Sequence, residues 1–282
     1  MRIGEPVLFI HGGAGASSSS EQDVRIRRRL RAICERAHRY LAGRSALEAV
    51  LFAVRWLEDD PLFNAGTGSV LQRDRKARMS ASVMDGARMR FAGVLNIQRV
   101  RNPVLVARAL LEREDRVLAG PEAQGFARSA GFVEWNPVTP ERARQWREAQ
   151  SRPYGTVGAV ARDRRGRLAA ATSSGGKPGA MAGRVSDSGT PAGNYADGRV
   201  AISCTGIGEE ILDEALAARV TQRVSDGMSL AKAMRGTFQA LRARNRRVAA
   251  IAVDRRGRPA WATTLPALFA VGRMRDRWIE TF

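Results

Sequence analysis

Histidine is nearly absent from this sequence, which contains only His11 and His38 among 282 residues. Metal sites of the H-E-x-x-H type are therefore excluded. The nucleophile elbow G-x-S-x-G occurs nowhere, which argues against a serine hydrolase with a histidine base. The stretches 13–15 and 206–208 lack the third glycine of a dinucleotide fingerprint, and proline follows Gly176-Lys177 where a P-loop needs serine or threonine. Nucleotide binding by either route is excluded.

Cysteine and long apolar runs are also scarce. Cys34 and Cys204 fall within predicted regular elements, so we expect no disulfide framework or metal cluster and interpret both as reduced core residues. No apolar run approaches the ~18 residues that a membrane span needs. The apolar segment 7–10 is also shorter than the ~7 to 15 residues of a signal-peptide core. We therefore expect a cytoplasmic protein with no membrane partner.

Lysine occurs only at positions 76, 177 and 232, so nearly all of the 47 basic residues are arginine. The formal net charge of +19 is shared almost evenly between the two halves of the chain, and there is no basic tail. The densest run, residues 25–31, fits a solvated helix face. A basic surface favours nonspecific binding to nucleic acid. The arginine bias is more easily explained by codon usage, however, and we expect no nucleic-acid partner.

The rest of the composition is that of a globular protein, 44% hydrophobic and 27% charged. The apolar run 6–10 predicts a buried strand that ends in a glycine loop at 11–15. Helical periodicity and capping residues predict helices over 21–42, 45–58, 103–112, 121–130, 140–150, 209–224 and 229–244. Strands are predicted over 69–72, 77–84, 89–97, on both sides of 163–166, and over 199–204, 247–253, 259–264 and 268–273, with a glycine-rich loop over 174–198.

Two groups of strands with helices outside them predict an α+β fold arranged as a four-layer sandwich. No linker is long enough to separate domains, so residues 1–282 are expected to share one core.

The candidate chemistry that remains consists of hydroxyl groups and glycines, at 156, 173–176 and 203–209. A threonine hydroxyl is a poor nucleophile at neutral pH and needs an adjacent base. An α-amine with a pKa near ~8 can be that base, because part of it is unprotonated at pH 7. The nitrogen of Thr156 is an amide until its bond to Gly155 breaks. An enzyme that uses Thr156 in this way must therefore cut itself first, and glycine at 155 can take the strained backbone that exposes its carbonyl.

Six stretches, spread in order over nearly the whole chain, carry a family resemblance: His11-Gly-Gly-Ala-Gly15, Phe63-Asn-Ala-Gly66, Met84-Asp-Gly86, Gly155-Thr-Val-Gly-Ala-Val160, Gly183-Arg-Val-Ser-Asp-Ser188 and Ser203-Cys-Thr-Gly-Ile-Gly-Glu209. The sequence resembles the plant-type L-asparaginase/isoaspartyl peptidase family. The resemblance implies an N-terminal nucleophile (Ntn) hydrolase, an αββα sandwich that cuts itself into an α piece, residues 1–155, and a β piece, residues 156–282. It also implies an (αβ)2 homo-oligomer that hydrolyses the side-chain amide of L-asparagine or the isopeptide bond of β-aspartyl dipeptides.

Catalytic roles also follow from the resemblance. Thr156, freed at the cleavage site Gly155–Thr156, would attack the substrate carbonyl. Ser174 would contact this nucleophile, and Asn64 would help to arrange the cleavage site. Thr205 and the backbone N–H of Gly206 would hold the oxyanion, close to the start of the helix predicted from residue 209.

Binding roles complete what the resemblance implies. Arg184 would hold the α-carboxylate of the substrate and Asp187 its α-amine, with Gly208 beside them. The loop 57–67 would wrap a structural sodium ion with backbone carbonyls, and no other cofactor is implied. The carbonyls would come from Leu57, Glu58, Asp60, Phe63, Ala65 and Thr67.

Three departures from the family pattern flank the predicted cleft: Ser174 replaces a usual threonine, Ser186 a usual glycine and Gly189 a usual proline. Two alternatives therefore stay open. One is a glycosylasparaginase-like amidase, whose cleavage stretch usually begins Asp-Thr-Ile-Gly where this chain has Gly-Thr-Val-Gly. The other is an uncleaved relative that binds nucleic acid through its basic surface.

Overall fold

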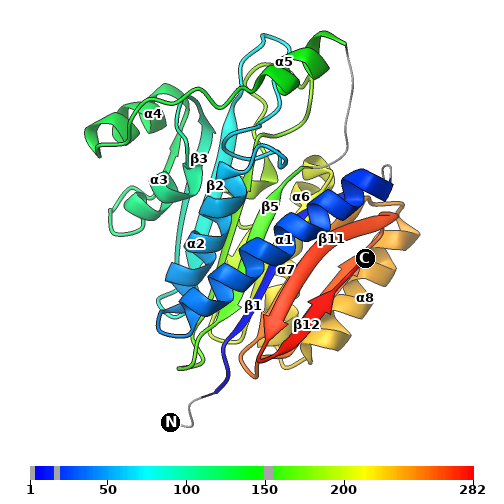
Figure 1. Ribbon diagram of the computed structural model, residues 1–282. Coiled ribbons are helices and arrows are strands. Elements are labelled where there is room, and N and C mark those ends of the chain that lie inside the picture. The colour runs from blue at the N-terminus through cyan, green and yellow to red at the C-terminus, as the bar shows by residue number, and fades with distance from the viewer. Residues whose placement is uncertain (1–3, 16–19, 149–154) are drawn as a thin grey trace.

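The computed structural model describes residues 4–15, 20–148 and 155–282. Within them two β-sheets lie face to face (Figure 1). The larger sheet has eight strands, in the order β12 (Arg277–Glu280), β11 (Ala267–Met274), β1 (Val7–Gly15), β5 (Val157–Arg162), β6 (Leu168–Ser174), β2 (Met79–Asp85), β3 (Arg90–Ile97) and β4 (Val117–Ala119). The smaller sheet has four, in the order β10 (Pro259–Thr263), β9 (Val248–Asp254), β8 (Val200–Gly206) and β7 (Asn194–Ala196).

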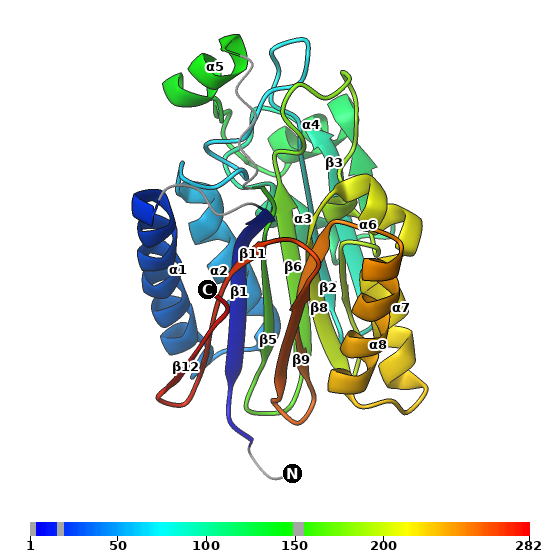
Figure 2. The same cartoon turned by 90° about the vertical axis from the view of Figure 1, so that its right-hand side faces the viewer.

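Helices cover the outer faces of the two sheets, as Figure 2 shows with α1 and α2 on one side and α7 and α8 on the other. The helices that pack on the larger sheet are α1 (Ser20–Leu41), α2 (Ala46–Asp59), α3 (Pro103–Leu110) and α4 (Gly120–Ser129). Those that pack on the smaller sheet are α6 (Gly208–Glu214), α7 (Leu216–Ser225) and α8 (Leu230–Ala243). The helix α5 (Pro140–Arg147) lies at the upper end of the molecule in both views. The predicted combination of helices with two groups of strands is confirmed.

Three apolar clusters hold these elements together, and strand alternation assigns each residue to one of them. In β5, Val157, Ala159 and Ala161 point toward α1, α2 and α3, whereas Val160 points toward the smaller sheet. Both faces of β5 are therefore buried, which explains its continuous apolar sequence. The third cluster lies between the smaller sheet and α6, α7 and α8.

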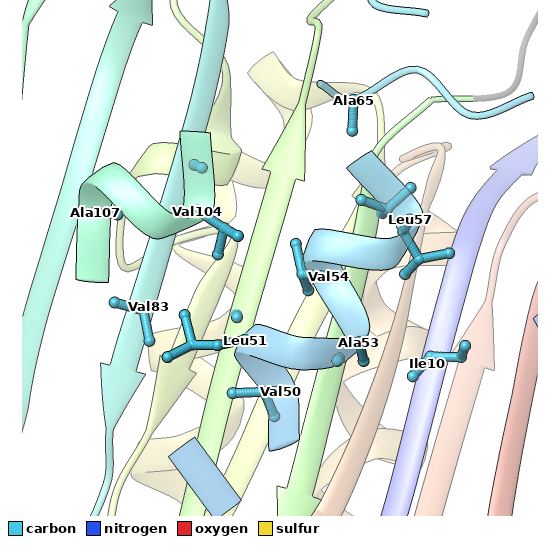
Figure 3. Close-up of a cluster of buried hydrophobic side chains, with 14 of the residues drawn as sticks. Ile10, Val50, Leu51, Ala53, Val54, Leu57, Ala65, Val83, Val104 and Ala107 are labelled. Atoms are coloured by element: carbon cyan, nitrogen blue, oxygen red, sulfur yellow. The ribbon is translucent and has the colours of Figure 1, made fainter. Parts of the chain in front are cut away.

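The helix α2 forms the centre of the first cluster. Its apolar side chains Val50, Val54 and Leu57 lie among side chains of β1, β2 and α3 (Figure 3). The predicted cap is present, because the Ser45 side chain accepts from the backbone N–H of Glu48 while the Glu48 carboxylate accepts from the N–H of Ser45. Such a reciprocal cap fixes the first turn of a helix.

Several expectations about secondary structure were wrong. The predicted glycine loop at 11–15 continues β1, with a bulge between His11 and Ala14 that is accommodated by a left-handed backbone at Gly13 (φ 117°). The helix predicted over 209–224 is two helices, because Ala215 takes a left-handed conformation (φ 44°). The stretch 69–72 is not a strand, since the N–H of Gln72 bonds to the carbonyl of Lys76 within a local turn. The strands β4 and β12 and, inside the loop 174–198, the 3-10 turn Asp187–Gly189 and β7 were not predicted.

Two hairpins use the same five residues, Asp-Arg-Arg-Gly-Arg, at 163–167 and 254–258. In each the first residue, Asp163 or Asp254, is buried, and its Oδ1 accepts hydrogen bonds from the N–H groups two and four residues later. The aspartate thus replaces backbone acceptors that a tight turn cannot supply. These hairpins join β5 to β6 and β9 to β10.

Both cysteines are buried and free, as predicted. No helix in the described part of the chain is long and apolar enough to cross a membrane.

Candidate active site

Thr156 lies immediately before β5, with only 6% of its surface exposed. Its Oγ1 donates a hydrogen bond to Ser174 Oγ, at 3.2 Å. The contact follows from the sheet, because Val157 of β5 pairs with Ser173 of β6 and so brings their neighbours together. Ser174 Oγ also accepts from the N–H of Gly176, at 3.0 Å. Two of the predicted catalytic hydroxyls therefore meet at one end of the larger sheet.

Asn64 joins the cleavage site to this pair. Its Nδ2 donates to the carbonyl of Gly176 at 2.8 Å, its Oδ1 accepts from the N–H of Val70 at 2.9 Å, and its own carbonyl accepts from the N–H of Gly175 at 2.8 Å. A Cβ placed on Gly155 would lie 3.9 Å from Asn64 Nδ2. These hydrogen bonds hold the Asn64 side chain beside the Gly155–Thr156 bond, which is predicted to break.

Arg184, Asp187 and Gly208 form a second group. The Arg184 guanidinium donates to both carboxylate oxygens of Glu209, from Nε at 2.9 Å and from Nη2 at 3.0 Å. A Cβ on Gly208 would lie 2.5 Å from Arg184 Nη2 and 2.8 Å from Asp187 Oδ1, so a larger residue there would displace both side chains. A Cβ on Gly176 would lie 3.5 Å from Arg184 Nη1, which places this group next to the Ser174 loop.

Asp187 is a buried carboxyl whose partners are incomplete. Ser186 Oγ donates to its Oδ1 at 3.2 Å, and its Oδ2 has no hydrogen-bond partner among the described residues. Burial raises the pKa of Asp187 to about 7, and the nearby charge of Arg184 opposes this rise. Such a carboxyl gains most from a cation that brings its own hydrogen-bond donors. Ser186, one of the departures from the family pattern, is therefore a direct hydrogen-bond donor to Asp187.

Thr205 and Gly206 end β8 in the smaller sheet. Alternation puts Thr205 on the same face as Ser203, which lies against Gly158 of β5 so closely that a Cβ on that glycine would overlap Ser203 Oγ. The same alternation puts Thr156 on the face of Gly158. Gly206 has a left-handed backbone (φ 130°), and a Cβ there would lie 2.5 Å from the carbonyl of Arg247. The helix predicted from 209 begins at Gly208 and has seven residues, so its dipole is that of two turns only.

His11 is a buried member of the site to which the sequence assigned no role. Its Nε2 lies 2.8 Å from Ser203 Oγ, and Ser203 Oγ lies 2.7 Å from Thr172 Oγ1. Burial lowers the pKa of His11 to about 3, opposed by an interaction with the backbone of Thr156. The imidazole is therefore neutral. Period-two alternation with Phe9 on β1 was the available signal that it points toward the smaller sheet.

A chain of polar contacts continues beyond His11 and Ser203. Thr172 Oγ1 donates to Asn194 Oδ1 at 3.2 Å, and Asn194 Nδ2 donates to the carbonyl of Ala170 at 3.4 Å. His11 Nε2 is a donor or an acceptor toward Ser203 according to its tautomer. His11 Nδ1 has no hydrogen-bond partner among the described residues.

The predicted sodium loop, residues 57–67, starts in the last turn of α2 and includes Asn64. Leu57 and Glu58 belong to the last turn of α2, and the other four predicted ligands, Asp60, Phe63, Ala65 and Thr67, follow it. The carbonyl of Glu58 accepts from the N–H of Thr67 at 2.8 Å, which closes the loop on itself. Among the residues that the structure describes, no three His, Cys, Asp or Glu side chains are grouped to hold a metal. Backbone binding of sodium stays a prediction.

Comparison with known proteins identifies the family to which the chain belongs. The family model described as asparaginase matches residues 4–281. The chain is 42% identical to the isoaspartyl peptidase/L-asparaginase of Nostoc sp., over 94% of this chain and 91% of the relative. It is 40% identical to the isoaspartyl peptidase of Escherichia coli, over 92% and 89%, and 39% identical to the plant-type L-asparaginase of Pyrococcus horikoshii, over 78% and 80%. The chain belongs to the asparaginase family that these relatives represent.

Proposed function

We propose that this protein is a self-processing amidohydrolase that cleaves the side-chain amide of L-asparagine, the isopeptide bond of β-aspartyl dipeptides, or both. The observation that carries the proposal is the position of Thr156: it directly follows Gly155, its hydroxyl bonds to Ser174, and Arg184 lies across the same loop. The names of the relatives support these two substrate classes.

The fold proposed for this function is the four-layer αββα sandwich of the Ntn hydrolases. In it, the Gly155–Thr156 bond breaks and leaves an α piece of residues 1–155 and a β piece of residues 156–282 within one folded unit. Two such units then form an (αβ)2 dimer. Support comes from the order of helices and sheets (Figure 2) and from the three clusters that separate them.

Thr156 performs the chemistry in two steps. Once it is the first residue of the β piece, its α-amine takes the proton of its own Oγ1, and the oxygen attacks the amide carbon of the substrate. The amine then passes that proton to the departing nitrogen, so ammonia or the amine of the dipeptide leaves and an acyl-enzyme remains. Water repeats the sequence and releases the aspartyl group. Ser174 accepts the Oγ1 hydrogen bond and orients the hydroxyl before attack.

The surrounding residues supply binding and charge stabilisation. Thr205 and the N–H of Gly206 donate to the oxyanion, where a fixed donor is worth about 10²–10³ in rate. Glu209 occupies Nε and Nη2 of Arg184, which leaves Nη1, on the Gly176 side, to face the α-carboxylate of the substrate. The unpartnered Oδ2 of Asp187 accepts the α-ammonium. Asn64 holds Gly155 during self-cleavage and the Gly176 loop afterwards.

No cofactor takes part in these steps. A sodium ion in the loop 57–67 would have a structural role, holding Asn64 in place through the backbone.

A denaturing gel and a substrate panel test the proposal. Wild type should give two bands, at the masses of residues 1–155 and 156–282, whereas Thr156→Ala should give one band and no turnover of asparagine or β-Asp-Leu. Thr156→Ser, the matched control, keeps the hydroxyl and should still cleave. A wild type that stays uncut after long incubation overturns the proposal. Faster hydrolysis of glycosylated asparagine than of either substrate favours the glycosylasparaginase alternative.

A further inference from the structure

Arg184 belongs to the segment 179–184, which is hydrogen-bonded to the turn between residues 71 and 78. The N–H of Gly179 donates to the carbonyl of Leu71, and the N–H of Arg73 donates to the carbonyl of Ala180, both at 2.9 Å. These two bonds hold the start of the segment. Arg184 lies farther along it and depends on a side chain from the same turn.

That side chain is Gln72, which is 2% exposed. Its Oε1 accepts from the N–H of Gly183 at 2.8 Å, and its Nε2 donates to the carbonyl of Arg184 at 2.8 Å. Gly183 has a left-handed backbone (φ 87°), and its carbonyl accepts from Asn96 Nδ2 at 2.6 Å. Gln72 therefore holds the peptide group that precedes Gly183 and the one that follows Arg184, and Asn96 holds the carbonyl of the peptide group between them.

An ion pair behind Gln72 fixes the orientation of its amide. Arg78 Nη1 donates both to Gln72 Oε1 and to Asp74 Oδ1 at 2.8 Å, and Arg78 Nη2 donates to Asp74 Oδ2 at 2.7 Å. With Arg78 and Gly183 both donating to Oε1, Nε2 must face the carbonyl of Arg184. Hydrogen bonds from Arg78 lower the pKa of Asp74 to about 2, so this support is ionised at any working pH.

We propose that Gln72, supported by Arg78 and Asp74, is a positioning residue that sets the place of Arg184 and thereby the affinity for the α-carboxylate of the substrate. The inference rests on the proposed function. It also adds a division of labour: Gln72 precedes the predicted cut and Arg184 follows it, so the α piece would position a binding group of the β piece without touching the substrate.

The test uses the full chain after self-processing, with Gln72→Ala compared with wild type on asparagine and β-Asp-Leu. Loss of the two hydrogen bonds from Gln72 to Gly183 and Arg184, each worth about a factor of 5 to 10, should raise KM roughly tenfold or more while kcat stays within about twofold. Lys76→Ala is the matched control, because Lys76 lies on the same turn with an exposed side chain. Its KM should equal that of wild type.

A second readout does not depend on turnover. Hydrogen exchange at the amide of Gly183 should be about tenfold faster in Gln72→Ala, because that amide loses its acceptor. A variant with wild-type KM, or with KM and kcat changed in proportion, overturns the positioning role. A wild type that hydrolyses neither substrate overturns the proposed function instead. In that case an unchanged exchange rate at the Gly183 amide separately overturns the claim that Gln72 holds this segment.

If Gln72→Ala does not fold, Arg78→Met replaces it in both measurements. This variant removes the support behind Gln72 and keeps the apolar stem of the side chain. It should raise KM about threefold and leave kcat unchanged, and an unchanged KM counts against the proposal.

Discussion

The space between the two sheets has an apolar end and a polar end, although the same strands line both. At the apolar end the inward positions are aliphatic or aromatic, and at the polar end the next inward positions of the same strands carry hydroxyls, an imidazole or glycine. The pairs are Phe9 and His11 on β1, Val160 and Gly158 on β5, Ala170 and Thr172 on β6, and Ala201 and Ser203 on β8.

This contrast separates the source of stability from the source of chemistry. The apolar end gains free energy from burial without any directional requirement. At the polar end each buried group costs free energy unless it is hydrogen-bonded. The contacts from His11 through Ser203 and Thr172 to Asn194 meet that requirement for the hydroxyls, whereas His11 Nδ1 has no hydrogen-bond partner among the described residues.

Phe9→Ala should break the apolar end and have the largest effect on stability. Phe9 is fully buried and packs edge-on against Trp261, with ring centroids 5.9 Å apart. Removing such a ring lowers the free energy of unfolding by about 3–5 kcal/mol, which urea unfolding measures. Val133→Ala, at a side chain 83% exposed, is the control and should change it by less than about 0.5 kcal/mol. Equal losses in the two variants would contradict the assigned core.

Gly158→Ala tests the boundary between the two ends. The new Cβ would overlap both Ser203 Oγ and His11 Nε2, so the hydrogen-bonded chain must move. Overpacking of this kind costs about 1–3 kcal/mol of stability, and self-cleavage on a gel should slow because Thr156 lies on the same strand face. The control is Gly125→Ala, where a Cβ meets no atom within 4 Å. A Gly158→Ala protein that cleaves at the wild-type rate would show that the chain does not support Thr156.

The pH dependence of kcat/KM tests the polar end, and of these predictions it has the smallest expected effect. The pKa of Asp187, raised by burial to about 7, leaves its carboxyl neutral and unable to pair with an ammonium group at lower pH. The value of kcat/KM should therefore fall about tenfold, or ~1.4 kcal/mol, for each pH unit below 7. Asp187→Asn should lower kcat/KM and remove this part of the pH profile. A profile identical in both proteins would assign the ionisation to another group, such as the Thr156 amine.

Ionisation of Asp187 should lower the stability of the folded protein as the pH rises, whereas it raises kcat/KM. The folded protein keeps this carboxyl protonated up to about pH 7, whereas an unfolded chain ionises it near its ordinary value of 3.8. Its burial therefore costs more free energy as the pH rises from 4 to 7. The Asp187→Asn protein should unfold at a higher temperature than wild type at pH 7, and the difference should disappear near pH 4.

The parts of the fold that sequence predicted well are those governed by local rules. The α2 cap depends on residues three apart, and the apolar periods of α1, α2 and α8 lie within single helices. The missed features depend on distant partners. The break at Ala215 accompanies burial of Glu214, which pairs with Arg219, Arg244 and Arg246. No residue in 209–224 indicates that Arg244 and Arg246 pair with Glu214.

The candidate site shows the same division. Short motifs predicted roles for Thr156, Ser174, Arg184 and Asp187 because each lies in a recognisable run of residues. Gln72 belongs to no such run, and its contact with Gly183 spans 111 positions of the chain. The sequence placed that position in a strand predicted over 69–72, with no role in the site, and only the fold brings the two segments together.

The sequence by itself determined the chemical inventory of this protein: a threonine after a glycine, an arginine and an aspartate in one short run, and strands that are apolar on both faces. Only the tertiary structure decided how these groups are held. It brought His11 to Ser203 across 192 positions of the chain, left one oxygen of Asp187 without a hydrogen-bond partner among the described residues, and placed Gln72 beside the backbone of Arg184. Hydrogen bonds require particular distances and directions, and residues far apart in the sequence meet those requirements only after the sheets have packed.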